Sequence, residues 1–283
     1  MGNIGDTKGD DWEAMAKIYK QLTVGVSHRP IAVILEKVDA LQPFSKATSI
    51  HDNGCGPGAI ISRIIQDYQI PSTASLTASD FSSHMIDQLK NTKEEEMKAD
   101  PKGPWSRLEL SVQDAMDLKS IPDVSQSHVT AGWVYFMTAD PMKCLTESHR
   151  ILKPNGVLGL SSWKDSQWMT ISNNGVTAVR PDAKTIEIPE EWKSAEGIAE
   201  ELKKANFKDI DSVEVQVDMT FDSHDGLVEL LSEKMPHIAS MTKDWSEDEK
   251  KQLKQTFREM IKEASPSEPG RMTGTALVAV GRK

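Results

Sequence analysis

The sequence has little cysteine, no long apolar run and a deficit of positive charge, and each feature excludes a class of protein. Its 283 residues include two cysteines, Cys55 and Cys144, which provide neither a disulfide framework nor zinc-ligand spacing. No apolar stretch is long enough to span a bilayer, and the first residues lack the basic and apolar segments of a secretion signal. We therefore expect a cytoplasmic protein without a membrane partner.

The charge balance limits the partners further. The formal net charge is −10, from 33 basic and 43 acidic residues. An acidic chain of this kind repels phosphate backbones, so we expect no nucleic-acid partner. No cluster of histidine and carboxylate residues has ligand spacing, so we expect no metal. A small molecule remains as the expected partner, and nothing in the sequence indicates the oligomeric state.

One short stretch, residues 47–58, combines the signals of a strand, a tight turn and a helix. A run with β-branched residues ends at Asp52, and glycines follow at the alternate positions Gly54, Gly56 and Gly58. An apolar helical run begins at once. This arrangement lets a backbone approach a nucleotide-like ligand at the carboxyl end of a strand. By itself it also satisfies the loose glycine pattern of NAD-binding proteins.

Two further aspartates help to distinguish a NAD site from a site for another nucleotide-like ligand. Asp80 ends the second expected strand and Asp114 follows the third, so in a doubly wound sheet they line one crevice with Asp52. An acid at Asp80 suits ribose hydroxyls. Asp114 can accept a hydrogen bond from an adenine amino group, while the N–H of Ala115 serves a ring nitrogen. The carboxylate of Asp52 suits a nearby ammonium or sulfonium and disfavours a pyrophosphate, which favours a methyl donor over NAD.

The remaining pattern alternates strands with helices and predicts an α/β fold, a parallel sheet with helices on both faces. We expect one domain, 11–283, after a disordered 1–10, with two N-terminal helices within 11–42 separated by a break at 23–29. Residues 91–104 are expected to form a charged surface loop. Strands are predicted to end at residue 52 and to span 74–80, 108–112, 128–135, 157–162, 210–221 and 273–280. Helices at about 226–240 and 246–263 form a predicted lid, 224–264.

The motifs resemble those of class I S-adenosylmethionine-dependent methyltransferases. The resemblance rests on 52–58, 79–85, 112–115, 150–156 and 201–207, and covers roughly 45–281. It implies a Rossmann-like seven-stranded sheet whose last strand is antiparallel. Shorter stretches, 22–23, 128–140 and 161–168, are similar to fungal secondary-metabolite methyltransferases, including S-methyltransferases acting on gliotoxin-type dithiols.

This resemblance implies a cofactor site for S-adenosylmethionine, with S-adenosylhomocysteine as product. Asp80 would bind the ribose, Asp114 and Ala115 would read the adenine edge, and Phe81 and Met85 would pack against its ring, unless the last two are ordinary core residues. The full implied set is Tyr19, Thr23, Asp52, Gly54, Gly56, Gly58, Asp80, Phe81, Met85, Asp114, Ala115, Gly132 and Trp133.

Aromatic residues near two strand ends suggest an apolar acceptor pocket. The predicted substrate-binding residues are Trp133, Tyr135, Phe136, Met137, Trp163 and Trp168, although half of the aromatic residues could belong to the core. None of the seven histidines has a spacing that identifies a general base, so the catalytic residue stays unassigned.

We therefore expect methyl transfer to the S, O or N atom of a small apolar metabolite, in secondary metabolism. Three alternatives stay open. The fold could bind the cofactor and catalyse a cyclisation or rearrangement without transfer. It could be a non-enzymatic, methyltransferase-like regulator. A NAD-dependent dehydrogenase is the third.

Overall fold

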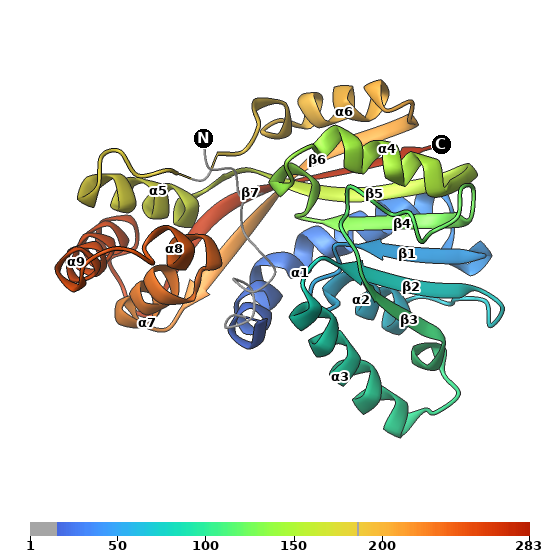
Figure 1. The fold of residues 1–283 in the computed structure, drawn as a ribbon, viewed down its shortest axis with the longest axis horizontal. Coiled ribbons are helices and arrows are strands. Elements are labelled where there is room, and N and C mark those ends of the chain that lie inside the picture. Colours follow the sequence, from blue (N-terminus) through green and yellow to red (C-terminus); the bar gives the residue numbers. More distant parts are fainter. Residues whose placement is uncertain (1–15, 186) are drawn as a thin grey trace.

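The computed structural model describes residues 16–185 and 187–283, which form a seven-stranded sheet in the order β3-β2-β1-β4-β5-β7-β6 (Figure 1). Strands β1 to β5 are parallel to one another, and β7 is antiparallel to both β5 and β6. The predicted seven-stranded fold with an antiparallel last strand is therefore confirmed. The strands are β1 (Ser49–Asn53), β2 (Ser75–Asp80), β3 (Leu108–Val112), β4 (Gln126–Gly132), β5 (Leu152–Ser166), β6 (Lys208–Phe221) and β7 (Gly270–Arg282).

Helices cover both faces of this sheet because each has one apolar face. Helices α1, α2 and α3 contribute Ile34, Ile61 and Leu89 to the core on one face, and α4 and α6 contribute Leu145 and Leu202 to the core on the other (Figure 1). The helices are α1 (Ala16–Leu41), α2 (Ala59–Asp67), α3 (Ser83–Ala99), α4 (Pro141–Ile151), α5 (Gln167–Val179), α6 (Ala195–Lys204), α7 (His224–Glu229), α8 (Pro236–Met241) and α9 (Glu247–Ala264).

Four helices form a lobe beyond the sheet, which we call the helical lobe: α5, α7, α8 and α9 (Figure 1). Strand β5 leads directly into α5, and β6 leads into α7, so the lobe extends from the carboxyl ends of these strands. Arg180, just after α5, forms a bidentate ion pair with Glu249 of α9 and lies 4.9 Å from the ring of Trp245. These contacts join the two parts of the lobe that are far apart in the sequence.

Two predictions about helices were wrong, and a third helix was not predicted. The break at 23–29 is absent, since α1 is continuous with Pro30 inside it, and its buried residues Ile34 and Leu35 secure it against the sheet. Residues 91–99 continue α3 because they are strong helix formers, and the next proline is Pro101. Helix α5 was not predicted because its middle contains asparagines and Gly175, which favour helices poorly.

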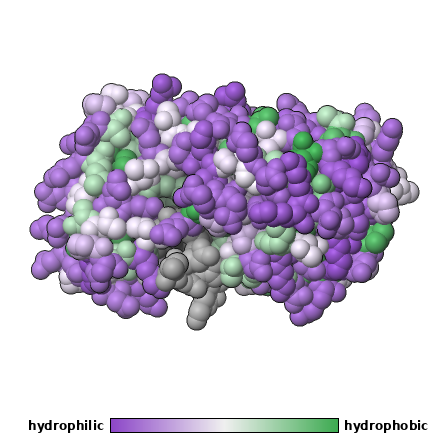
Figure 2. Space-filling view, turned by 90° about the horizontal axis from the view of Figure 1, so that it is seen from above, coloured by the Kyte–Doolittle hydropathy of each residue, from purple (hydrophilic) through white to green (hydrophobic). Residues whose placement is uncertain are grey.

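One face of the surface agrees with the polar composition. The face seen in Figure 2 is largely hydrophilic, with small separate apolar areas. Among the described residues, no helix has the length and apolar character needed to cross a bilayer.

Gly175→Ala tests how closely α5 and α9 pack. A Cβ at this position would lie 2.3 Å from Cε1 and 2.5 Å from Cδ1 of Phe257, whose ring is fully buried. Alanine normally stabilises a helix interior by about 1 kcal/mol relative to glycine. Here we expect a net loss of about 1–3 kcal/mol in the free energy of unfolding, measured with urea, because the core becomes overpacked.

The matched control is the double variant Gly175→Ala with Phe257→Leu. Leucine removes the ring edge, so the added methyl group fills the vacated space, and the double variant should lose less stability than the two single variants together. A Gly175→Ala variant more stable than the wild type would contradict this packing.

Candidate active site

The glycine turn between β1 and α2 has three residues with left-handed backbone conformation. Gly54, Gly56 and Gly58 have φ of +69°, +52° and +93°. A Cβ at Gly54 would approach Val134 Cγ2 to 2.4 Å, and one at Gly58 would approach Leu89 Cδ1 to 2.3 Å. At Gly56 nothing lies within 4 Å of that position. Two glycines therefore permit packing, whereas Gly56 exposes its backbone to open space where a ligand can approach.

Asp80 is the residue that fixes this turn. It is 6% exposed, and its Oδ2 accepts a hydrogen bond from the Gly56 N–H at 2.8 Å. Its Oδ1 accepts from the Ser82 N–H at 2.9 Å. Burial raises its pKa, although these backbone hydrogen bonds oppose that change. Phe81 contributes a third backbone hydrogen bond to this carboxylate. Since a carboxylate has about four acceptor positions, one remains for a ribose hydroxyl.

Asp52 joins three elements beneath the turn. Its Oδ1 accepts a hydrogen bond from the Thr130 hydroxyl of β4 at 2.8 Å, and its Oδ2 accepts from the Ile61 N–H of α2 at 3.2 Å. The side chain is buried, and burial raises its pKa to about 7. The Asp52 carboxyl group therefore holds β1, β4 and the first turn of α2 together on the buried side of the glycine turn.

The predicted adenine-binding residues divide into exposed and buried members. Phe81 is 46% exposed, so an apolar ring is available directly after Asp80, while Met85 is buried in the core. Asp114 is exposed, and its Oδ1 accepts from the Met116 N–H at 2.8 Å; Ala115 is buried. Phe81 and Asp114 follow the adjacent strands β2 and β3, so they lie at one edge of the sheet.

Three tryptophans form a continuous series from β4 to α5. The rings of Trp133 and Trp163 stack with centroids 5.5 Å apart, and Trp168 meets Trp163 edge-on at 5.2 Å. Trp133 has a strained φ of +55°, and its N–H donates to Ser161 Oγ at 3.1 Å. Its Nε1 is buried and has no hydrogen-bond acceptor among the described residues. A strained residue with an unsatisfied donor is typical of a functional site.

The prediction that β4 continues to residue 135 was wrong, because β4 ends at Gly132 and residues Tyr135–Met137 form a 3₁₀ turn, η5. Tyr135, Phe136 and Trp168 are buried in the core, where they cannot line an open acceptor pocket. The Tyr135 hydroxyl lies 2.5 Å from Ser148 Oγ and accepts from Asn53 Nδ2 at 3.1 Å. Sequence reasoning missed the buried Asn53, although an amide directly before Gly54 was a visible signal.

The other predicted residues are placed as follows. Met137 is half-buried and packs against the core on the α4 face. At Gly132, an added Cβ would lie 2.7 Å from Cδ1 of Ile60, so this glycine packs closely against α2. Tyr19 and Thr23 fall in α1, where their side chains lie outside the described part of the structure. Within residues 16–185 and 187–283, no group of three or more histidine, cysteine or carboxylate residues could hold a metal ion.

Asp52→Asn tests the raised pKa. The folded protein holds the Asp52 proton up to about pH 7, whereas the unfolded chain releases it near pH 4, so wild-type stability falls over this interval as pH rises. The free energy of unfolding of the wild type should fall relative to Asp52→Asn between pH 4 and 7, by up to about 4 kcal/mol. The control Asp87→Asn removes an exposed carboxylate on α3. Wild-type and Asp52→Asn curves that stay parallel would contradict the shift.

Comparisons with known proteins identify the family of this chain. A family model described as a methyltransferase domain matches residues 51–160. Methyltransferase ucsB of Acremonium sp is 36% identical, over 99% of this chain and 98% of that protein. Acetylaranotin bis-thiomethyltransferase of Aspergillus terreus is 23% identical, over 77% of this chain and 74% of that protein.

Among solved structures, phosphoethanolamine N-methyltransferase 2 of Haemonchus contortus, in complex with phosphomonomethylethanolamine and S-adenosylhomocysteine, has a TM-score of 0.56 and 14% identity. That match covers 100% of this chain and 60% of the other, and it shows a shared fold. The similarity to methyltransferase ucsB extends over nearly all of both chains. The chain therefore belongs to the methyltransferase family, and its resemblance to the class I S-adenosylmethionine-dependent enzymes is confirmed.

Proposed function

We propose that this protein transfers the methyl group of S-adenosylmethionine to a small apolar acceptor, at the crevice formed by the carboxyl ends of β1, β2, β3 and β4. The observation that carries the proposal is the pairing of Gly56 with Asp80. An N–H of an open glycine turn is fixed at 2.8 Å by a carboxylate that keeps one further acceptor position. When bound, the cofactor supplies an electrophilic methyl carbon attached to a good leaving group.

The residues around the turn suit the three parts of this cofactor. The open backbone at Gly56 accommodates the methionine part, and the remaining acceptor position of Asp80 suits a ribose hydroxyl. The exposed ring of Phe81 provides a surface for adenine stacking, with the Asp114 carboxylate as acceptor for its amino group. Met85 supports this surface from the core.

We further propose that the acceptor binds against Trp133 and Trp163, which are half-buried, while the buried Trp168 supports Trp163 from the core. Stacked and edge-on indoles form a wall that favours a flat or apolar molecule. The Nε1 of Trp133, which has no acceptor among the described residues, can donate to a polar group of a bound molecule. Met169, half-buried beside this wall, can adapt to its irregular edge.

Sulfur is the favoured nucleophile among S, O and N. A thiol is partly ionised near neutral pH, so its methylation requires positioning and exclusion of water more than a general base. The name of the Aspergillus terreus relative, a bis-thiomethyltransferase, supports the same choice and a role in secondary metabolism. Oxygen or nitrogen acceptors are the alternatives within this proposal.

Asp80→Ala tests the cofactor site. Loss of hydrogen bonds to a charged acceptor should weaken the binding of S-adenosylhomocysteine by about 1–3 kcal/mol, measured by calorimetry. The control Asp87→Ala removes an exposed carboxylate of α3 and should bind as the wild type does. Equal affinity of Asp80→Ala and wild type would refute the ribose assignment. No binding to the wild type would favour a non-enzymatic regulator, or a dehydrogenase if NAD instead raises the melting temperature.

Trp163→Leu tests the acceptor wall. The protein is incubated with S-adenosylmethionine and thiophenol, phenol or aniline, and S-adenosylhomocysteine is measured by mass spectrometry. We expect methylation of thiophenol, with kcat/KM about three- to tenfold lower in Trp163→Leu because the stacked contacts are lost. Affinity for S-adenosylhomocysteine should stay within about twofold of the wild-type value, because the cofactor contacts remain.

The control for this experiment is Trp105→Leu, the same replacement in η4 (Pro104–Arg107) outside the crevice. Turnover that is equally reduced in both variants would contradict the assignment of Trp163. Binding of the cofactor without formation of S-adenosylhomocysteine from any acceptor would favour the cyclisation or rearrangement alternative.

A further inference from the structure

The loop that follows β3, residues 113–124, has to hold Asp114 at the crevice although it contains no helix or strand. Its first anchor is the N–H of Gln113, which donates to the Asp80 carbonyl at 3.0 Å. Within the loop, the N–H of Asp117 donates to the Asp114 carbonyl at 2.9 Å and closes a turn. These contacts fix the start of the loop, residues 113–117, but not the residues from Leu118 onward.

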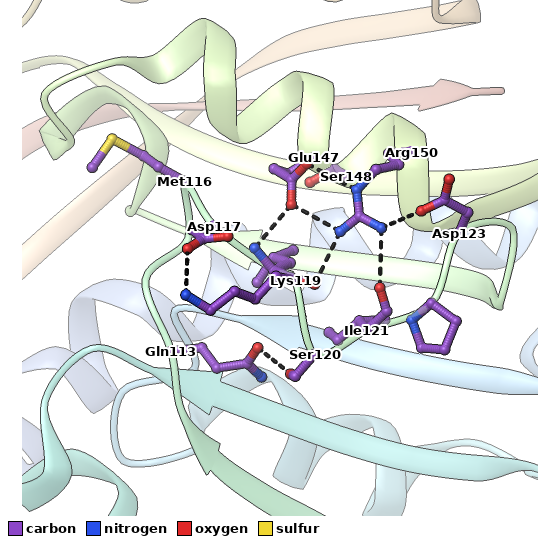
Figure 3. Close-up of polar contacts among 12 residues, drawn as sticks. Gln113, Met116, Asp117, Lys119, Ser120, Ile121, Asp123, Glu147, Ser148 and Arg150 are labelled. Atoms are coloured by element: carbon purple, nitrogen blue, oxygen red, sulfur yellow. Dashed lines mark hydrogen bonds and ion pairs between the residues drawn. The ribbon is translucent and has the colours of Figure 1, made fainter.

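Helix α4 supplies the second anchor through Arg150 and Glu147 (Figure 3). Arg150 Nη2 donates to the Leu118 carbonyl at 2.9 Å, and Nη1 donates to the Ile121 carbonyl at 3.0 Å. Glu147 Oε2 accepts from the Leu118 N–H at 2.9 Å. Both backbone groups of Leu118 are therefore bound by side chains of one helix.

The two anchoring side chains also fix each other. Arg150 Nε and Nη2 donate to the two carboxylate oxygens of Glu147 at 2.9 and 2.8 Å, and Nη1 contacts Asp123 Oδ1 at 2.5 Å (Figure 3). The hydrogen bond from Arg150 lowers the pKa of Glu147, and that of Arg150 is raised by the same pairing. The planar guanidinium thus spans the glutamate and two loop carbonyls at once, which an ammonium group cannot do.

We propose that Arg150 and Glu147 are positioning residues for adenine recognition, and this rests on the cofactor site proposed above. Only residues 114–117 lie between the anchors at Gln113 and Leu118. Fixing both ends sets where the Asp114 carboxylate and the Ala115 N–H lie relative to the crevice. The pair therefore determines selectivity for adenine rather than overall affinity for the cofactor.

Comparison of two ligands, S-adenosylhomocysteine and S-inosylhomocysteine, tests this inference. Hypoxanthine replaces the amino donor of adenine with a carbonyl and protonates N1, so it mismatches both Asp114 and Ala115. Calorimetry should show that the wild type prefers the adenine ligand by roughly tenfold or more. In Arg150→Lys and in Glu147→Gln, which keeps an acceptor for Leu118, the preference should fall to about threefold or less because the loop can shift.

Arg107→Lys is the matched control. Arg107 also donates to backbone carbonyls, those of Pro71 and Ala74, but it makes no such contact with residues 113–124. The Arg107→Lys variant should therefore keep the wild-type preference for the adenine ligand. A second readout uses ligand-free protein: amides of residues 113–124 should exchange with deuterium faster in Arg150→Lys than in Arg107→Lys.

The outcomes separate this inference from the proposed function. No binding of S-adenosylhomocysteine to the wild type would refute the proposed cofactor site itself. A wild-type preference that persists in folded Arg150→Lys and Glu147→Gln would overturn the positioning role. An equal loss of affinity for both ligands would also overturn it, since a merely structural role predicts that result.

Discussion

The arrangement of the site depends on one hydrogen bond, from the N–H of Gly56 to the carboxylate of Asp80. It connects the turn after β1 with the end of the neighbouring strand β2, and so converts two adjacent strand ends into one surface. The bond is possible because Gly56 adopts a left-handed conformation and carries no side chain. Asp52 supports the same turn from the buried side, through Thr130 and Ile61. Asp80 and Asp52 therefore fix the conformation of the glycine turn in the ligand-free protein.

The sequence predicted the fold and this turn well, because glycines at alternate positions and aspartates at strand ends are local signals. It failed where tertiary packing overrides local preference. A break was expected at 23–29, yet burial of the α1 face keeps the helix continuous there and through Pro30. Gly175 weakened the pattern of α5, although the close approach of Phe257 requires a glycine there. Tyr135 was expected in a pocket, but its hydroxyl is satisfied by Asn53 and Ser148 within the core.

The architecture separates the two halves of the proposed reaction. Strands β1, β2 and β3 carry the residues proposed for the cofactor, whereas β4, β5 and the helical lobe carry the tryptophan series. Trp133 lies at the junction of the two, with its backbone fixed to Ser161. Such a division lets the acceptor surface vary while the turn around Gly56 stays the same. The proposed anchoring of residues 113–124 by Arg150 acts on the cofactor side of this division.

A crystal structure of the protein with S-adenosylhomocysteine tests the central claim most directly. The account predicts ribose hydroxyls within hydrogen-bond distance of the Asp80 carboxylate, the homocysteine part along the backbone at Gly56, and adenine against Phe81 with its amino group at Asp114. A ligand bound in the helical lobe, or one whose ribose points away from Asp80, would contradict it.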